Sequence, residues 1–185
     1  MRIIAGSARG RKLLSPVGMG TRPTLDRIKE AIFNIIQNRV RNAIVVDMFS
    51  GTGSLGLEAA SRGAKHTYLF DSGALTYSIL NENIKLFNFE SICTASKMSC
   101  YEGALNLSKK GLVFDLIFID PPYSKDMIPP AIELIEANNL LNSEGLIVTK
   151  VDSKEIIFEG SSKIKLTDTR KYGNTIVCFY KYKEV

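Results

Sequence analysis

The stretch AIVVDMFSGTGSLGLEAA, residues 43–60, runs from an apolar segment through a glycine loop into a helical pattern. Residues 43–49 predict a buried strand, and residues 55–62 predict a helix. Gly51 and Gly53 permit backbone conformations, and a close ligand approach, that a Cβ atom would block. Gly56 would let the helix pack closely on the strand. Such a strand–loop–helix unit is typical of the ligand-binding edge of an α/β sheet.

Strand and helix patterns continue to alternate after this unit. The predicted strands are residues 66–70, 91–95, 112–119 and 145–151, and the predicted helices are residues 74–87, 100–109 and 128–138. Residues 164–169 and 175–182 read as two further strands joined by a turn. The pattern predicts an α/β fold: a mostly parallel, doubly wound sheet with a C-terminal antiparallel hairpin at one edge.

The segment before this unit is strongly basic. Residues 1–14 contain Gly6 and Gly10 and predict a hairpin, and residues 24–37 predict a helix with Lys29 away from its apolar face. Residues 1–41 hold nine Lys/Arg and two Asp/Glu, a net charge of +7, whereas the remaining residues hold 15 Lys/Arg and 17 Asp/Glu, a net charge of −2. Such a concentration of positive charge indicates a polyanionic partner. Nucleic acid is the favoured candidate, and a membrane surface is the alternative.

Composition excludes several classes of protein. No apolar run approaches the roughly 20 residues that span a bilayer, and no secretory signal is present, so we expect a cytoplasmic protein. Cys93, Cys100 and Cys178 lack metal-binding spacing, and we expect them to be buried and reduced. His66 is the sole histidine and is expected to be structural. We therefore expect no metal site.

The glycine loop alone leaves two readings open. Residues 51–56 match the dinucleotide GxGxxG pattern, and Asp71, 20 residues after Gly51, stands where a carboxylate would hold ribose hydroxyls. Asp47 favours the second reading, a nucleoside sulfonium. A buried carboxylate needs a partner, and the methionyl ammonium of S-adenosylmethionine would supply one, although nearby loop N–H groups could also do so. A dinucleotide has no use for a negative charge there.

The segment Asp120-Pro121-Pro122-Tyr123 follows a strongly predicted strand. The prolines stiffen the loop, so that the Asp120 carboxylate and the Pro121 carbonyl can accept both N–H bonds of an exocyclic base amine. Tyr123 can stack on the base. These groups suit methyl transfer to the amine by positioning, with Asp120 orienting it rather than acting as a strong base. The alternative is an ordinary Pro-Pro turn.

The sequence resembles the RsmD-type 16S rRNA guanine-N2 methyltransferases over nearly its whole length. The resemblance rests on residues 6–13, Arg22-Pro23-Thr24 with Asp26-Arg27 and Glu30, Phe33-Asn34, residues 47–58, residues 120–123 and residues 171–175. It implies a Rossmann-like class I methyltransferase domain at residues 42–185 with a basic hairpin-plus-helix extension at residues 1–41. It also implies S-adenosylmethionine as methyl donor and 16S rRNA, within the small ribosomal subunit, as substrate.

Motifs and resemblance together give three sets of candidate residues. The catalytic set is Asp120, Pro121, Pro122 and Tyr123; the cofactor set is Asp47, Ser50, Gly51, Gly53, Leu55, Asp71, Ser72 and Met98; the RNA-contacting set is Arg9, Arg11, Lys12, Arg22 and Arg27. Arg22-Pro23-Thr24 could instead close the cofactor pocket.

The sequence departs from the family pattern at two places. Gly73 stands where a second acidic residue is usual, and Lys97-Met98 replaces the usual Asp/Asn-Ala, so adenine recognition is expected from the Met98 backbone and apolar packing. Glu58 matches the family but could be a surface partner of Arg62. The alternative functions are a DNA adenine-N6 methyltransferase, an NAD-dependent oxidoreductase and a non-catalytic RNA-binding module.

Overall fold

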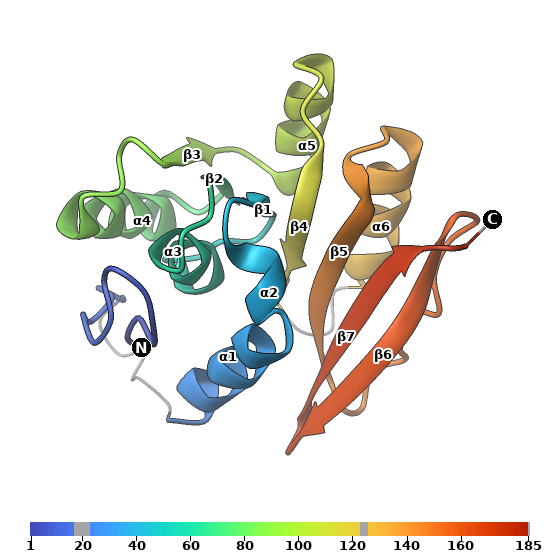
Figure 1. Ribbon diagram of the computed structural model, residues 1–185, viewed down its shortest axis with the longest axis horizontal. Coiled ribbons are helices and arrows are strands. Elements are labelled where there is room, and N and C mark those ends of the chain that lie inside the picture. The colour runs from blue at the N-terminus through green and yellow to red at the C-terminus, as the bar shows by residue number, and fades with distance from the viewer. Residues whose placement is uncertain (17–22, 123–125, 185) are drawn as a thin grey trace.

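The computed structural model describes residues 1–16, 23–122 and 126–184 (Figure 1). Helices and strands alternate along most of the chain. They are α1 (Pro23–Ile35), α2 (Gln37–Val40), β1 (Ile44–Asp47), α3 (Ser54–Ser61), β2 (His66–Asp71), α4 (Ala74–Phe87), β3 (Cys93–Lys97), α5 (Cys100–Lys109), β4 (Phe114–Ile119), α6 (Ile128–Ala137), β5 (Leu141–Asp152), β6 (Ile164–Tyr172) and β7 (Thr175–Tyr182).

The strands form one sheet in the order β3-β2-β1-β4-β5-β7-β6. The first five are parallel to one another, and β7 is antiparallel to both β5 and β6. The chain winds outward from β1 through β2 to β3 and then returns to β4, so the winding direction reverses between β1 and β4. The predicted doubly wound sheet and its C-terminal hairpin are confirmed.

Helices cover both faces of the sheet (Figure 1). Successive strand residues point to opposite faces, so Val45 packs with α1 and α3 while Val46 packs with α5 and α6. Leu116 and Ile117 divide in the same way. This double burial explains why the central strands read as continuous apolar runs without alternation.

Most predicted boundaries agree with the structure, and those of α4, α5 and β7 agree fully. The predicted helix over residues 24–37 is instead two helices, α1 and α2, separated at Ile36. Ile35, the last residue of α1, is 45% exposed, whereas Ile36, which separates the two helices, is 1% exposed. Strand β5 also begins four residues earlier than predicted, at Leu141.

Residues 1–14 form the expected hairpin, which we call the N-terminal ribbon. The amide of Ile3 donates to the carbonyl of Arg11 at 2.9 Å, and the amide of Leu13 donates to that of Met1 at 3.1 Å. Ile3 and Leu13 pack into a cluster with apolar residues of α3 and α4. The ribbon therefore shares a hydrophobic core with the sheet domain.

A buried carboxylate, Glu58 of α3, anchors the ribbon and α1. It is fully buried and accepts hydrogen bonds from the amides of Ile4 (2.8 Å) and Ala5 (3.0 Å). It also pairs with Lys29 at 3.4 Å and with Arg62 at 2.7 Å. The expectation that Lys29 lies on an exposed face was therefore wrong: Lys29 is 2% exposed, and burial lowers the pKa of its ammonium. The Glu58–Arg62 pair exists, but the ribbon covers it.

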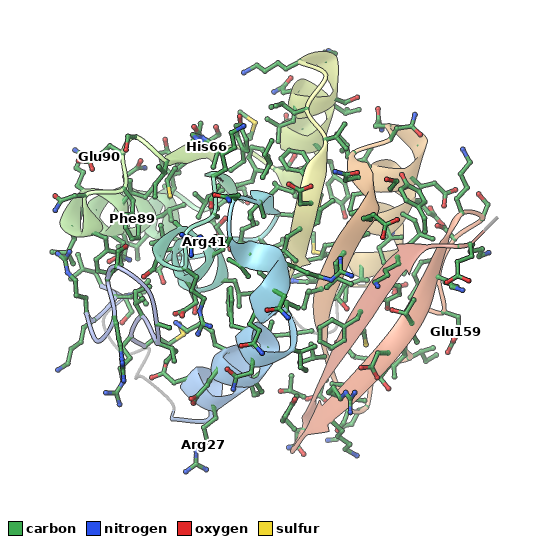
Figure 2. All side chains as sticks on the ribbon, in the orientation of Figure 1. Arg27, Arg41, His66, Phe89, Glu90 and Glu159 are labelled. Atoms are coloured by element: carbon green, nitrogen blue, oxygen red, sulfur yellow. The ribbon has the colours of Figure 1, made fainter. Side chains whose placement is uncertain are left out.

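Replacing Glu58 tests this anchor. Glu58→Gln leaves the Lys29 ammonium buried without its counter-charge, which costs about 3–5 kcal/mol of unfolding free energy when a buried pair is broken. We expect that loss in urea denaturation, together with faster hydrogen exchange at the Ile4 and Ala5 amides. Glu90→Gln, at an exposed position labelled in Figure 2, is the control. Equal stability of the two variants would contradict the anchoring role.

Candidate functional site

A cavity of about 680 Å³ opens at the carboxyl ends of β1, β2 and β4, where the winding of the sheet reverses. Ligands of open α/β sheets bind at this position, and the volume lies in the usual range for small-molecule sites. The wall comes from the glycine loop, the ends of β2 and β4, and residues 98–101. The N-terminal ribbon and the chain after it close the remaining side with Met1, Ser15 and Pro16.

Asp47, at the end of β1, is 1% exposed behind the glycine loop. Its Oδ2 accepts a hydrogen bond from the Gly56 amide at 2.9 Å, whereas its buried Oδ1 accepts none from the described residues. Burial raises the pKa of this carboxyl to about 7, the Gly56 and Phe49 backbone N–H groups oppose that rise, and the Asp120 charge adds to it. Asp47 is therefore a buried acid beside two loop N–H groups, and its Oδ1 makes no hydrogen bond of normal geometry.

The three glycines of the loop serve different purposes. Gly51 has φ 54°, and a Cβ there would meet open space, so it keeps the cavity side of the loop free. Gly53 has φ 97° and lies against Leu57 and Leu80, away from the cavity lining. A Cβ on Gly56 would come within 3.2 Å of Asp47 Oδ2, so the close helix–sheet packing expected at Gly56 is present.

Asp71, at the end of β2, holds this loop in place. Its Oδ2 accepts from the Gly51 amide at 2.9 Å, and its Oδ1 accepts from the Gly73 amide at 2.8 Å and from the Thr76 hydroxyl. Gly73, where the family has a second acid, thus contributes its N–H group. Asp71 lines the cavity while it ties the first glycine of the loop to the start of α4.

The structure brings most of the predicted cofactor residues together. Those that line the cavity are Ser50, Gly51, Leu55, Asp71, Ser72 and Met98. Asp47 and Gly53 do not line it: Asp47 is buried behind the glycine loop. The sequence analysis missed Met1, Lys29, Thr76, Tyr101 and Lys150, which also line it. Met1 and Lys29 reach the cavity through tertiary docking, which has no local signal in the sequence. Lys150 lies near the end of a predicted strand, so the rule that ligands bind at the carboxyl ends of strands could have found it.

Asp120 directly follows β4 and forms an ion pair with Lys150 of the neighbouring strand β5. Lys150 Nζ lies 2.6 Å from Asp120 Oδ2, and both side chains are partly buried. The pairing of Ile119 with Thr149 places these two residues next in register. The carboxylate therefore stands at the cavity rim with one oxygen held by a cation.

A second cavity, of about 290 Å³, shares Pro121, Pro122, Met127 and Lys150 with the first. Apolar residues of α6, β5 and the following loop complete it: Ile128, Val151, Ile156 and Phe158. Pro121 and Pro122 thus line both cavities, whereas Asp120 lines only the larger one. Tyr123, predicted to stack on a base, lies outside the described residues.

The predicted RNA-contacting residues do not form one group. Arg9 and Lys12 are exposed on the N-terminal ribbon, and the side chain of Arg27 extends from α1 into solvent (Figure 2). Arg11 is exposed but has a structural contact, since its guanidinium lies 5.0 Å from the Phe87 ring centroid. Arg22 lies outside the described residues.

The cysteines and His66 lie in structural positions, as the sequence analysis expected. The three cysteines are free and buried, and burial raises the pKa of Cys93 and of Cys100 to about 12. His66 begins β2, at the opposite end from the cavity, and its Nε2 lies 2.8 Å from the Thr94 hydroxyl. Among the described residues we find no group of acidic, histidine or cysteine side chains suited to a metal ion, and no helix that could cross a membrane.

Comparison with known proteins extends over the whole chain. Residues 1–181 match the model of the family described as conserved hypothetical protein 95. Ribosomal RNA small subunit methyltransferase D of Escherichia coli is 35% identical over 149 residues, covering 80% of this chain and 72% of that protein. YlbH of Bacillus subtilis, named as a candidate rRNA methyltransferase, is 32% identical over 98% of both chains.

The solved structure of the E. coli protein yhhF, described as a candidate methyltransferase, superposes with a TM-score of 0.86. It is 28% identical and covers 99% of this chain and 98% of its own. Together with the glycine loop and the Asp-Pro-Pro segment at one cavity, these matches show that the chain belongs to the RsmD-type methyltransferase family.

Proposed function

We propose that this protein transfers a methyl group from S-adenosylmethionine to the N2 amine of a guanine in 16S rRNA of the small ribosomal subunit. The observation that carries the proposal is the Asp120-Pro121 segment, which lies where two cavities adjoin, with its carboxylate fixed by Lys150. The name of the B. subtilis relative supports ribosomal RNA as the substrate class, and the name of the E. coli relative supports RNA of the small subunit. Because the proposed substrate is part of the ribosome, we expect the protein to act in the cytoplasm.

The larger cavity suits S-adenosylmethionine, which supplies an electrophilic methyl group when bound. The unpaired Oδ1 of Asp47 supports this fit, because a buried carboxylate at this point needs a cation such as the methionyl ammonium. Gly51 leaves room for close approach of the ligand. Asp71 and Ser72 would hold ribose hydroxyls, and Met98 would pack on the adenine.

Asp120 and Pro121 would orient the amine that accepts the methyl group. A carboxylate only accepts hydrogen bonds. With one oxygen held by Lys150, the other Asp120 oxygen and the Pro121 carbonyl supply two acceptors for the two N–H groups of an exocyclic amine. Guanine and adenine both carry such an amine, so the proposal of guanine N2 rests on the resemblance to the guanine-N2 methyltransferases, and the methylated product distinguishes it from the DNA adenine-N6 alternative.

Lys150 holds one oxygen of Asp120 in a fixed direction. Asp120 would act by positioning, because the amine loses its proton readily to solvent once it is alkylated. Well-aligned reactants can save roughly 7–11 kcal/mol of barrier. The base that carries the amine would occupy the second cavity, against its apolar wall, with Tyr123 as the predicted stacking partner.

The extension at residues 1–41 would have two roles. Arg9, Lys12 and Arg27 present exposed cations to RNA phosphates, whereas Met1 lines the cofactor cavity. Deleting the ribbon would damage both functions, so single substitutions are the better probe of RNA contact. Nothing in the described cavity favours a dinucleotide or a vestigial pocket.

Methyl transfer tests the proposal directly. Incubation with labelled S-adenosylmethionine and small subunits from cells that lack this gene should place label in 16S rRNA as N2-methylguanosine. Asp120→Ala should lower kcat by at least 100-fold, because the amine loses its orienting acceptor, while the dissociation constant for S-adenosylhomocysteine stays within about threefold. Label in DNA alone would overturn the proposal, and equal loss of binding and turnover would assign Asp120 to the cofactor.

The pKa of Asp47 predicts how cofactor binding depends on pH. Because burial raises this pKa from 3.8 to about 7, the carboxyl is neutral at pH 5.5 and ionised at pH 8.5. The methionyl ammonium stays charged throughout, so the affinity for S-adenosylhomocysteine should rise up to about tenfold per pH unit below 7 and then level off. Titration calorimetry measures this.

Asp47→Asn is the matched variant, since its amide oxygen can still accept from the Gly56 amide. Its affinity should be weaker at pH 8 and nearly constant with pH. The free energy of unfolding of the ligand-free wild type should also fall as the pH rises from about 4 to about 7. In this range the Asp47 carboxyl is ionised in the unfolded chain but still protonated in the folded protein. A wild-type affinity that does not change with pH would assign the ammonium to another partner.

A further inference from the structure

Positive charge is concentrated in two segments rather than one. Residues 161–184 hold six Lys/Arg and two Asp/Glu, a net charge of +4, whereas residues 42–160 hold nine Lys/Arg and 15 Asp/Glu, a net charge of −6. The net charge of −2 over residues 42–185 as a whole does not show this contrast. Most of residues 161–184 form the β6–β7 hairpin, so the hairpin is a second basic element besides the N-terminal extension.

Four of these lysines gather at the open end of the hairpin. Lys165 and Lys181 are direct cross-strand partners, and the Lys183 amide donates to the Lys163 carbonyl at 2.8 Å. Alternation along each strand places all four on one face. Ile164 between them is fully buried on the opposite face. We call this group the lysine square: Lys163, Lys165, Lys181 and Lys183.

Among the described residues, no ion pair involves the lysine square, and the nearest carboxylate in the contacts of the open end is Glu136 of α6, which accepts hydrogen bonds from the Lys163 and Ile164 amides. The Lys183 Nζ donates to the Ser161 carbonyl. Like charges directly opposite each other across two strands are destabilising. Protection of an exposed sheet edge would explain Lys165 on the outer strand β6. Lys181 lies on β7 one residue beyond its last pairing with β5, at Tyr180, and Lys183 follows the strand.

The lysine square lies far from the active site. Asp152, near the cavities, pairs with Thr175 at the closed end of the hairpin, so the open end is at the opposite edge of the sheet. The open end and the N-terminal ribbon lie on opposite sides of the molecule (Figure 1). A short RNA bound at the ribbon and the cavities would not reach the lysine square, whereas a large folded RNA could contact both.

We propose that the lysine square binds the phosphodiester backbone of a second segment of ribosomal RNA, away from the segment that enters the active site. This inference rests on the proposed function for the identity of the polyanion. A phosphate bound at each ammonium group would supply a counter-charge. Binding would therefore reduce the electrostatic repulsion between the paired lysines of the free hairpin. The enzyme would then recognise the folded subunit through two separated contacts, with the reactive nucleotide at only one of them.

The test compares two double variants with equal charge. Lys165→Gln/Lys181→Gln removes half of the lysine square, and Lys109→Gln/Lys110→Gln removes two exposed lysines at the end of α5. Binding to small subunits from cells lacking this gene is measured against salt concentration. The first variant should bind roughly tenfold more weakly and lower the logarithmic salt slope by about 1.4–1.8, at 0.7–0.9 per lost phosphate contact. The second should match the wild type.

Further measurements separate the possible failures. Lys165→Glu should keep or raise the melting temperature by pairing with Lys181, while its affinity for subunits falls, which excludes unfolding as the cause. Equal binding by the two double variants would overturn the inference. The inference would also be overturned if Lys165→Gln/Lys181→Gln no longer bound vesicles of anionic phospholipid but bound small subunits as tightly as the wild type. A wild type that binds subunits through these lysines but transfers no methyl group would refute the proposed function and leave the inference standing.

Discussion

The buried carboxylate of Asp47 is the constraint on which the site depends. It ends β1 where the winding of the sheet reverses, and its bond to the Gly56 amide fixes the first turn of α3. The glycine loop must then pass over it, and Asp71 ties that loop to β2 and α4 through the Gly51 amide. One oxygen of Asp47 remains unpaired inside the protein. The free protein thus keeps a costly group at the place where a cationic ligand would stabilise it.

A second buried acid, Glu58, connects this site to the basic extension. Through the amides of Ile4 and Ala5 and through Lys29, it fixes the ribbon and α1 against α3. The same docking places Met1 and Lys29 in the cavity wall. Under the proposed function, RNA bound at the ribbon would contact an element that also lines the cavity. By linkage, RNA and cofactor would each strengthen the binding of the other if both favour the docked ribbon.

Much of the fold followed from the sequence, because both faces of the central strands are buried and the apolar runs of β1 and β4 are long. Local motifs also predicted the groups at the strand ends, such as Asp71 and Asp120. Contacts between distant segments were not accessible in this way. Lys29 was expected on the surface because nothing near it in the sequence indicates Glu58, and Lys150 pairs with Asp120 only through the register of β4 and β5. The net charge of the hairpin can be counted from the sequence, but the cross-strand pairing of Lys165 with Lys181 is visible only in the structure.

The central claim is that this protein modifies guanine N2 in 16S rRNA. Mass spectrometry of nucleosides from 16S rRNA, purified from cells with and without the gene, tests it most directly. The account predicts that one N2-methylguanosine per 16S molecule disappears with the gene and returns when the wild-type gene, but not the Asp120→Ala variant, is supplied. Unchanged N2-methylguanosine, or loss of a methylated adenine instead, would contradict it.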